Sequence, residues 1–287
     1  MDTIERYHGS SPIDRGSKLW DWHNNTFEKD TVVAGIRKHY TDPESLDLVG
    51  YIHYAGLTQA LMLGYSLEAI RYKLECYGAL FWMYNDCWGE VGWTIIDYYL
   101  DRKPSFYAVK RALAPRRIIL RPENQTVGAV VCNDTASPFD LDYRAGFVSF
   151  DGTVDKTDRG HISVPAFERR KIAIETEPGP ITGPMATGLF VLWPKADIHP
   201  AFLRPGPYGE LTIPKTSVSL EVEEVPQDNR ALLTFRSATY AHAVHPELPR
   251  GAVPDDDYFD LLPGESRTVQ VANVTVENVQ GLRVRTE

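Results

Sequence analysis

The hydrophobic pattern of this 287-residue chain changes at residue 115, and this change constrains the fold more than any other feature. Before it, apolar residues recur at helical spacing in residues 26–40, 43–78 and 103–115. After it, short runs alternate between apolar and polar residues and are separated by Gly, Pro, Asn and Asp. That second pattern is typical of antiparallel sandwiches. The sequence therefore predicts a helix-containing N-terminal part followed by all-β domains.

The N-terminal part also contains a short, continuously apolar run, "ALFWMY" at residues 79–84. Such a run predicts a buried strand of the parallel type, covered on both faces. The preceding segment reads as one helix or as two helices broken near Gly64, with Pro43 suited to its start and Gly78 to its end. Helix, buried strand, loop and helix together indicate an α/β layer.

The β part divides at a Pro- and Gly-rich stretch, residues 199–214, which we interpret as a linker or a crossover between sheets. We therefore expect three units, at residues 1–115, 116–206 and 207–287. Trp193 lies in a predicted strand and is expected in the core. His242 and His245 are expected to be surface residues of a loop.

Charge and cysteine content limit the classes of partner. The formal net charge of −9 argues against a nucleic-acid or anionic-membrane partner, because such partners require a basic face. No stretch reaches the roughly 18 apolar residues of a membrane span. The three cysteines, Cys76, Cys87 and Cys132, form no zinc-like spacing. We therefore expect no metal and no cofactor. Because the N-terminus is unlike a signal peptide, a cytoplasmic location is favoured.

Aromatic, amide and carboxylate side chains gather directly after the predicted strand. If that strand belongs to a β/α barrel, Trp82, Asn85, Asp86 and Trp88 lie at its C-terminal end, where such barrels place their active sites. An indole face suits the apolar face of a sugar ring, and an amide and a carboxylate can bind hydroxyls. The alternative is that Trp82 is a core residue and that Asp86 caps a turn.

The segment "GALFWMYNDCWGEVGWTIIDYYLDRKPSFYAVKRALAP" resembles the last barrel strand and closing helix of the β-mannosidases of glycoside hydrolase family 2. Met83 and Gly89 depart from the pattern, which has Gln and Pro at those positions. "WHNNTF", with His23, resembles the loop after the seventh strand, and "DDDYFDLLPGESRTVQV" resembles a motif of the C-terminal immunoglobulin-like domain. The positions that match the pattern are Gly78, Leu80, Trp82, Asn85, Asp86, Trp88, Trp93, Asp97, Tyr98, Lys103, Tyr107 and Ala108.

The resemblance implies a multidomain α/β plus all-β chain: the C-terminal portion of a (β/α)8 barrel followed by two immunoglobulin-like β-sandwiches. It implies retaining hydrolysis of terminal β-D-mannosyl residues by the complete protein. Trp82 would be the platform under the sugar, Asn85 and Asp86 would position hydroxyls or loops, and Trp88 and His23 would wall the pocket. The expected partners are a carbohydrate substrate and a missing N-terminal part of the same protein.

Retaining glycosidases need two carboxyl groups, one as nucleophile and one as acid/base. The family supplies them in Asn-Glu and Ser-Glu-aromatic-Gly stretches, and neither dipeptide occurs in this chain. No catalytic residue is therefore assigned, and the chain alone is expected to be inactive. Two alternatives stay open: another glycosidase of the same family, acting on β-glucosaminides, β-galactosides or β-glucuronides, and a non-catalytic carbohydrate-binding or assembly fragment.

Overall fold

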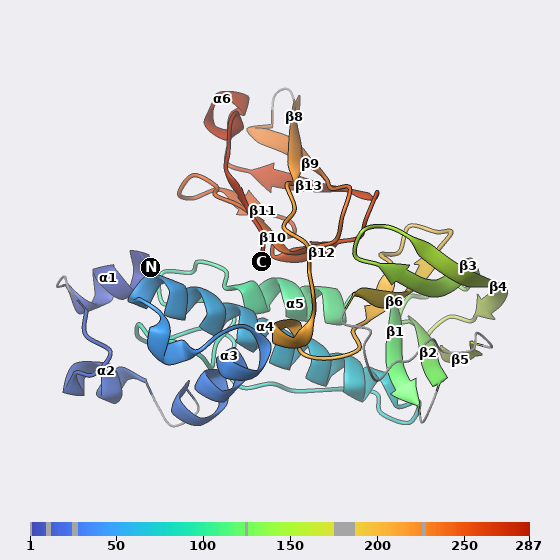
Figure 1. The fold of residues 1–287 in the computed structure, drawn as a ribbon, viewed down its shortest axis with the longest axis horizontal. Coiled ribbons are helices and arrows are strands. Elements are labelled where there is room, and N and C mark those ends of the chain that lie inside the picture. The colour runs from blue at the N-terminus through green and yellow to red at the C-terminus, as the bar shows by residue number, and fades with distance from the viewer. Residues whose placement is uncertain (1, 10–12, 25–27, 124–125, 175–186, 226–227) are drawn as a thin grey trace.

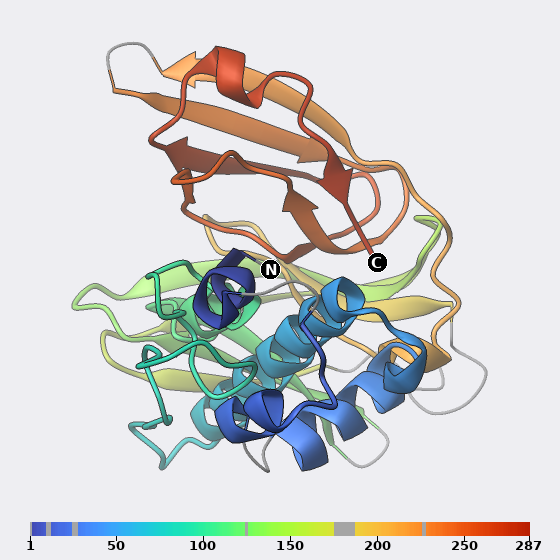
Figure 2. The ribbon, with the colours of Figure 1, turned by 90° about the vertical axis from the view of Figure 1, so that its left-hand side faces the viewer.

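The computed structural model describes residues 2–9, 13–24, 28–123, 126–174, 187–225 and 228–287. A helical N-terminal part is followed by two β-sandwiches (Figure 1). The helices lie beside the first sandwich, and the C-terminal sandwich lies across both, as Figure 2 also shows. Among the described residues no helix is both long enough and apolar enough to span a bilayer. The sandwich part of the predicted fold class is confirmed; the two predicted boundaries between the three units remain predictions.

The predicted helical segments form helices, with different bounds. The elements are α1 (Asp2–His8), α2 (Lys18–His23), the π-helix η1 (Glu28–Val32), α3 (Val33–His39), the 3-10 turn η2 (Pro43–Ser45), α4 (Leu48–Tyr72) and α5 (Pro104–Ala112). The long helix α4 begins where the Asp47 side chain accepts a hydrogen bond from Gly50 N at 2.8 Å, a regular N-cap. It ends at Tyr72, before Gly78.

Of the two alternatives, one helix or two helices broken near Gly64, the structure has a single helix, in which the glycines serve helix packing. A Cβ at Gly56 would lie 3.0 Å from Cγ of Pro104, and one at Gly64 would lie 3.5 Å from Cβ of Ala108. Both contacts are with α5, so small residues on α4 let the two helices approach closely. Helix interiors tolerate glycine at a cost of about 1 kcal/mol, which tertiary packing can offset.

The predicted buried strand at residues 79–84 is wrong. The segment forms no strand; nearby, only isolated bridges from Asn85 to Ile96 and from Ile96 to Arg102 are present among the described residues. Leu80 is 102% exposed and Trp82 is 73% exposed. The physical reason is that a strand needs neighbours along its length to satisfy its backbone groups, whereas only the last residue of this segment has one in the described part of the chain: Tyr84 O accepts hydrogen bonds from Ile95 N at 3.3 Å and Ile96 N at 3.1 Å.

The first sandwich faces a three-stranded sheet, in the order β1-β2-β5, against a four-stranded sheet, β4-β3-β6-β7. Its strands are β1 (Arg116–Glu123), β2 (Thr126–Asn133), β3 (Phe139–Ser149), β4 (Val154–Val164), β5 (Arg169–Ala173), β6 (Gly188–Pro194) and β7 (Ala201–Leu203). All pairs are antiparallel, as the period-two pattern predicts. Inward-facing residues such as Ile118, Leu141 and Leu192 are fully buried between the sheets.

The C-terminal sandwich has a four-stranded sheet, β11-β13-β9-β8, and a three-stranded one, β12-β10-β14. Its elements are β8 (Ser219–Val225), β9 (Arg230–Arg236), β10 (Ala241–Pro246), β11 (Val253–Pro254), β12 (Phe259–Leu261), β13 (Ser266–Ala272), α6 (Val276–Val279) and β14 (Val284–Arg285); the turn η3 (Tyr208–Glu210) precedes it. Phe235, Phe259 and Val271 are buried in its core.

The prediction that His242 and His245 are surface loop residues is wrong. Both lie in β10, and His242 is only 5% exposed. Each histidine has a carboxylate partner: His242 Nδ1 lies 2.6 Å from Asp260 Oδ1, and His245 Nδ1 lies 3.0 Å from Asp257 Oδ1. Paired polar groups can be buried, and these partners come from a neighbouring segment that a local pattern does not reveal.

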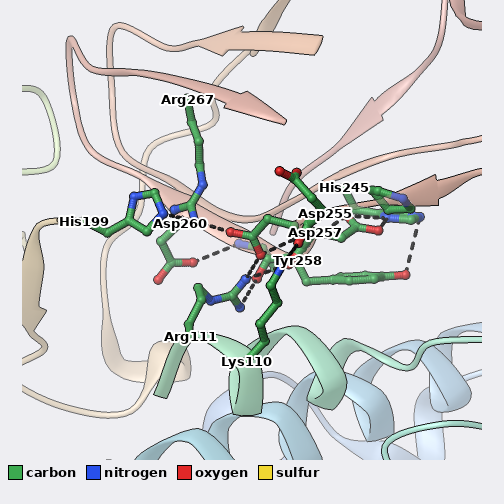
Figure 3. Close-up of polar contacts among 12 residues, drawn as sticks. Lys110, Arg111, His199, His245, Asp255, Asp257, Tyr258, Asp260 and Arg267 are labelled. Carbon is green, nitrogen blue, oxygen red and sulfur yellow. Dashed lines mark hydrogen bonds and ion pairs between the residues drawn. The ribbon is translucent and has the colours of Figure 1, made fainter. Parts of the chain in front are cut away.

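The C-terminal sandwich is joined to the helical part by polar contacts (Figure 3). Arg111 of α5 and Arg267 of β13 both form ion pairs with Asp256. Burial alone would raise the pKa of Asp256, but the two guanidinium groups lower it below its usual value. Arg111 also donates to the carbonyl oxygen of Tyr258 at 3.0 Å.

Candidate functional site

Aromatic rings from segments far apart in the sequence meet around His23. The ring centres of His23 and Trp88 are 5.2 Å apart, and those of Trp22 and Trp88 are 6.1 Å apart. Tyr7 of α1 lies edge-on to His23 at 5.0 Å. The structure thus brings together two of the five residues predicted to surround a ligand. It adds Trp22 and Tyr7, which the sequence prediction did not include.

The short helix α2 explains why Trp22 lies at the surface, whereas its last residue, His23, is buried. Ser17 Oγ accepts a hydrogen bond from Trp20 N at 3.1 Å and so caps the helix start. Trp20 is 2% exposed and packs into the core of the helical part. Two positions later, about 200° around the helix axis, Trp22 points outward and is 71% exposed.

Asp86 lies inside the protein, in an ion pair with Lys103. Its side chain is 1% exposed, and its Oδ2 lies 2.9 Å from Nζ of Lys103, the residue that precedes α5. The same ammonium group donates to Thr94 Oγ1 at 2.8 Å. A buried carboxylate is costly unless a cation or hydrogen bonds compensate it. Asp86 is therefore placed to hold the segment 85–97 against α5.

Two amide side chains also hold this segment. Asn24 Oδ1 accepts a hydrogen bond from Val91 N at 2.7 Å. Gln59, in the middle of α4, donates to the carbonyl oxygens of Gly92 at 2.6 Å and Thr94 at 3.0 Å. Sequence reasoning missed both amides. For Gln59 the signal was a polar residue within an apolar helical stretch.

Trp82 and Asn85 are directed outward. The Trp82 side chain is exposed, and Asn85 is exposed with its amide donating to the carbonyl oxygen of Asp86 at 3.3 Å. Leu80 and Tyr84 are exposed beside them in the chain. Trp82 thus offers a free indole face, whereas Trp88 is half-buried against His23. The predicted assignment of these five residues to a sugar site stays a prediction.

Retaining glycosidases use two carboxyl groups, and the five residues of the predicted site include one. The one carboxylate of the predicted site, Asp86, is already paired with Lys103. Across the described ranges there is no group of three or more His, Cys, Asp or Glu side chains able to hold a metal ion. The chemistry available at this surface is stacking on indole rings and hydrogen bonding by an amide.

No protein-family model matches the chain. The chain does match curated relatives named Beta-mannosidase B. The one from Aspergillus flavus is 42% identical over 130 residues, which are 43% of this chain and 15% of the relative. That of Emericella nidulans is 44% identical over 82 residues, 27% of this chain and 10% of the relative. The chain thus spans only 10–15% of the length of these relatives in the aligned regions.

Solved structures match nearly the whole chain. The β-D-mannosidase of Dictyoglomus thermophilum matches 89% of this chain and 31% of its own, with a TM-score of 0.80 and 25% identity. The exo-chitosanase of Amycolatopsis orientalis matches 88% of this chain and 35% of its own, with a TM-score of 0.69 and 17% identity, which shows the fold alone. These findings confirm the resemblance to the C-terminal part of the β-mannosidases of glycoside hydrolase family 2.

Proposed function

We propose that this chain is the C-terminal portion of a retaining glycosidase that removes terminal β-D-mannosyl residues. Residues 1–115 would complete a catalytic (β/α)8 barrel, and residues 116–206 and 207–287 would be its two immunoglobulin-like domains. The observation that carries the proposal is the match of 89% of the chain to a β-D-mannosidase at a TM-score of 0.80. The 42% identity to Beta-mannosidase B supports the same substrate class.

Within that enzyme, the indole of Trp82 would lie under the sugar ring. Covering about 100 Å² of apolar surface at about 25 cal/mol per Å² contributes roughly 2.5 kcal/mol to binding. Trp88 and His23, whose rings lie 5.2 Å apart, would form a side wall. The exposed Asn85 amide would bind a hydroxyl group. Asp86 would act indirectly, since its ion pair with Lys103 holds the segment that carries Trp88.

The catalytic carboxylates would come from the remainder of the protein. Two carboxyl groups about 5–5.5 Å apart are required for a retaining mechanism, and the family motifs that carry them do not occur here. Exposed apolar residues support a covering partner: Tyr77, Leu80 and Tyr84 come from one segment. A surface of this kind marks an interaction site. We propose that barrel strands from the remainder of the protein cover this surface.

The test compares the 287-residue chain with the complete protein, expressed from the reading frame extended upstream of Met1. With 4-nitrophenyl β-D-mannopyranoside, the complete protein should turn over and the chain should not. Turnover by the chain alone would refute the assignment of catalysis to the missing part. If the complete protein instead prefers the β-glucosaminide, β-galactoside or β-glucuronide, that sugar replaces mannose as the proposed substrate.

A further inference from the structure

A cavity of about 750 Å³ lies where the helical part and the two sandwiches meet. Its walls come from α3, α4, β1, the segment around β7, and strands β10, β12 and β13. None of the five residues of the proposed sugar site lines it. Its volume lies within the range of small-molecule sites, roughly 300–1,000 Å³. The cavity is therefore a separate candidate site, independent of the proposed function.

The lining is cationic in a protein that is anionic overall. Six lysine or arginine residues and three carboxylates face the cavity, whereas the chain as a whole has a net charge of −9. The cations are Lys38, Arg111, Arg117, Arg121, Arg204 and Arg267; the carboxylates are Glu68, Asp260 and Glu265. Burial raises the pKa of Glu265 above its usual value.

Three of these guanidinium groups have carboxylate partners. Arg117 pairs with Glu68 at 2.6 Å. Arg111 and Arg267 share Asp256. The remaining cations, Arg121, Arg204 and Lys38, have no carboxylate within ion-pair distance among the residues that the structure describes.

Arg121 is the most unusual of them, because it is only 8% exposed. Its guanidinium lies 3.7 Å from the centre of the Tyr65 ring and donates to the Tyr65 carbonyl oxygen. Its Nε is buried and has no hydrogen-bond partner within the described part of the chain. A buried cation without a counter-charge is costly. An anion in the cavity would supply both the charge and the missing acceptor.

Arg204 and His39 lie on a second wall of the cavity. Arg204 stacks 4.0 Å from the centre of the Tyr208 ring and donates a hydrogen bond to the Gly206 carbonyl oxygen at 3.0 Å. Burial, together with the positive charges of Arg204 and Lys38, lowers the pKa of His39 to about 4. His39 is thus neutral at pH 7, and its buried Nδ1 lacks a partner among the described residues.

We propose that this cavity binds a small organic anion through phosphate or carboxylate oxygens, with Arg121 and Arg204 as the contacting residues. Arg121 lies in β1 and Arg204 directly follows β7, and the contact between these two strands supports a shared ligand. Guanidinium groups match the planar geometry of such oxyanions, and tyrosine rings on the same walls can contact an organic body. Since all three parts of the chain line the cavity, the bound anion would also hold the parts together.

The test is calorimetric titration of the 287-residue chain with inorganic phosphate, glucose 6-phosphate and glucuronate, each against sodium chloride at equal ionic strength. Saturable binding of at least one oxyanion is expected. Arg121→Gln and Arg204→Gln should each weaken it about tenfold or more, since a charged hydrogen bond contributes about 1.5–3 kcal/mol. The matched control is Arg159→Gln, which removes an exposed arginine of β4 outside the cavity and should bind like the parent.

A second measurement separates binding from a structural role of Arg121. Without anion, Arg121→Gln should unfold at the same or a higher temperature than the parent, because it removes an uncompensated buried charge. With anion, the parent should gain thermal stability and the variant should not. No saturable binding by the parent, or equal affinity in all four proteins, would overturn the proposal.

Discussion

Replacing Asp260 by Asn should destabilise the folded protein, because Asp260 accepts hydrogen bonds from several buried groups of the C-terminal part. Both carboxylate oxygens are in use. Oδ1 accepts hydrogen bonds from His242 Nδ1 at 2.6 Å and Ala243 N at 3.0 Å. Oδ2 accepts from the hydroxyl groups of Tyr208 and Tyr240, both at 2.8 Å. In the asparagine side chain an NH2 group takes the place of one carboxylate oxygen. This NH2 group would then face the hydrogen-bond donors from which that oxygen accepts.

The expected loss follows from burial. The side chains of His242 and Asp260 are 7% and 9% exposed, so solvent does not screen their interaction. Breaking a buried ion pair by removing one charge costs about 3–5 kcal/mol. The isosteric amide keeps the volume and part of the hydrogen bonding. We therefore expect Asp260→Asn to lower the free energy of unfolding by about 3 kcal/mol at pH 7.

The effect should depend on pH with a defined sign. Burial alone would raise the pKa of Asp260, but the charge of His242 and the hydrogen bonds from His242, Ala243 and Tyr240 lower it well below its usual range. A lowered pKa stabilises the folded state above the pKa of an unfolded aspartate, about 3.9. This stabilisation begins to decline as the pH falls below that value and is lost as the pH falls through the lower pKa of the folded state. The difference between parent and variant should thus be full at pH 6–7 and shrink below about pH 4.

Urea unfolding of both proteins at pH 7, 5 and 3.5 measures this difference. The matched control is Asp142→Asn, which removes the carboxylate of an exposed pair: Asp142 Oδ1 lies 2.7 Å from His161 Nδ1, with side chains 63% and 57% exposed. An exposed pair contributes less than about 1 kcal/mol. A loss for Asp260→Asn no larger than that of the control, or one that does not change with pH, would refute the reasoning.

Three further outcomes are expected. Lys103→Met should lower the free energy of unfolding by about 3 kcal/mol because it leaves Asp86 buried and unpaired. Amide hydrogen exchange in residues 85–97 should become faster in this variant, and unchanged exchange would contradict the prediction. Trp82→Ala should leave stability within about 0.5 kcal/mol, since the side chain is 73% exposed. In the complete enzyme it should raise KM for a β-mannoside roughly fiftyfold, and an unchanged KM would exclude it as the platform. In a thiol-reagent assay the exposed Cys87 should react in the folded chain, whereas Cys132, whose thiol pKa is raised by burial, should react only after unfolding.

The local pattern of the sequence predicted most elements. Alternation of apolar and polar residues predicted the strands from Arg116 onward. Successive side chains of a strand point to opposite faces of the sheet, and one face is buried while the other is exposed. Helical spacing marked α4, whose aspartate cap is itself a local signal. These features depend only on residues that are close together in the sequence, and the sequence alone was therefore sufficient to predict them.

Local patterns failed where the outcome depends on a distant partner. The run "ALFWMY" is apolar enough for a buried strand, yet no strand of the described chain lies beside it, and Leu80 and Trp82 face outward. His242 reads as a polar residue of a loop, but Asp260 and the tyrosines around it allow it to be buried. Spacing cannot show whether a neighbour is present.

For the candidate site, the sequence determined the kinds of side chain and the family resemblance. It placed Trp82, Asn85, Asp86 and Trp88 in one short stretch, and it paired them with a distant His23 only through that resemblance. Tertiary structure decided their roles: it brought His23 to 5.2 Å from Trp88, turned Trp82 outward and enclosed Asp86 beside Lys103. It also formed the cationic cavity, whose walls come from three parts of the chain. The physical reason is that burial and ion pairing arise from the packing of segments far apart in sequence, whereas periodicity reports only on neighbours along the chain.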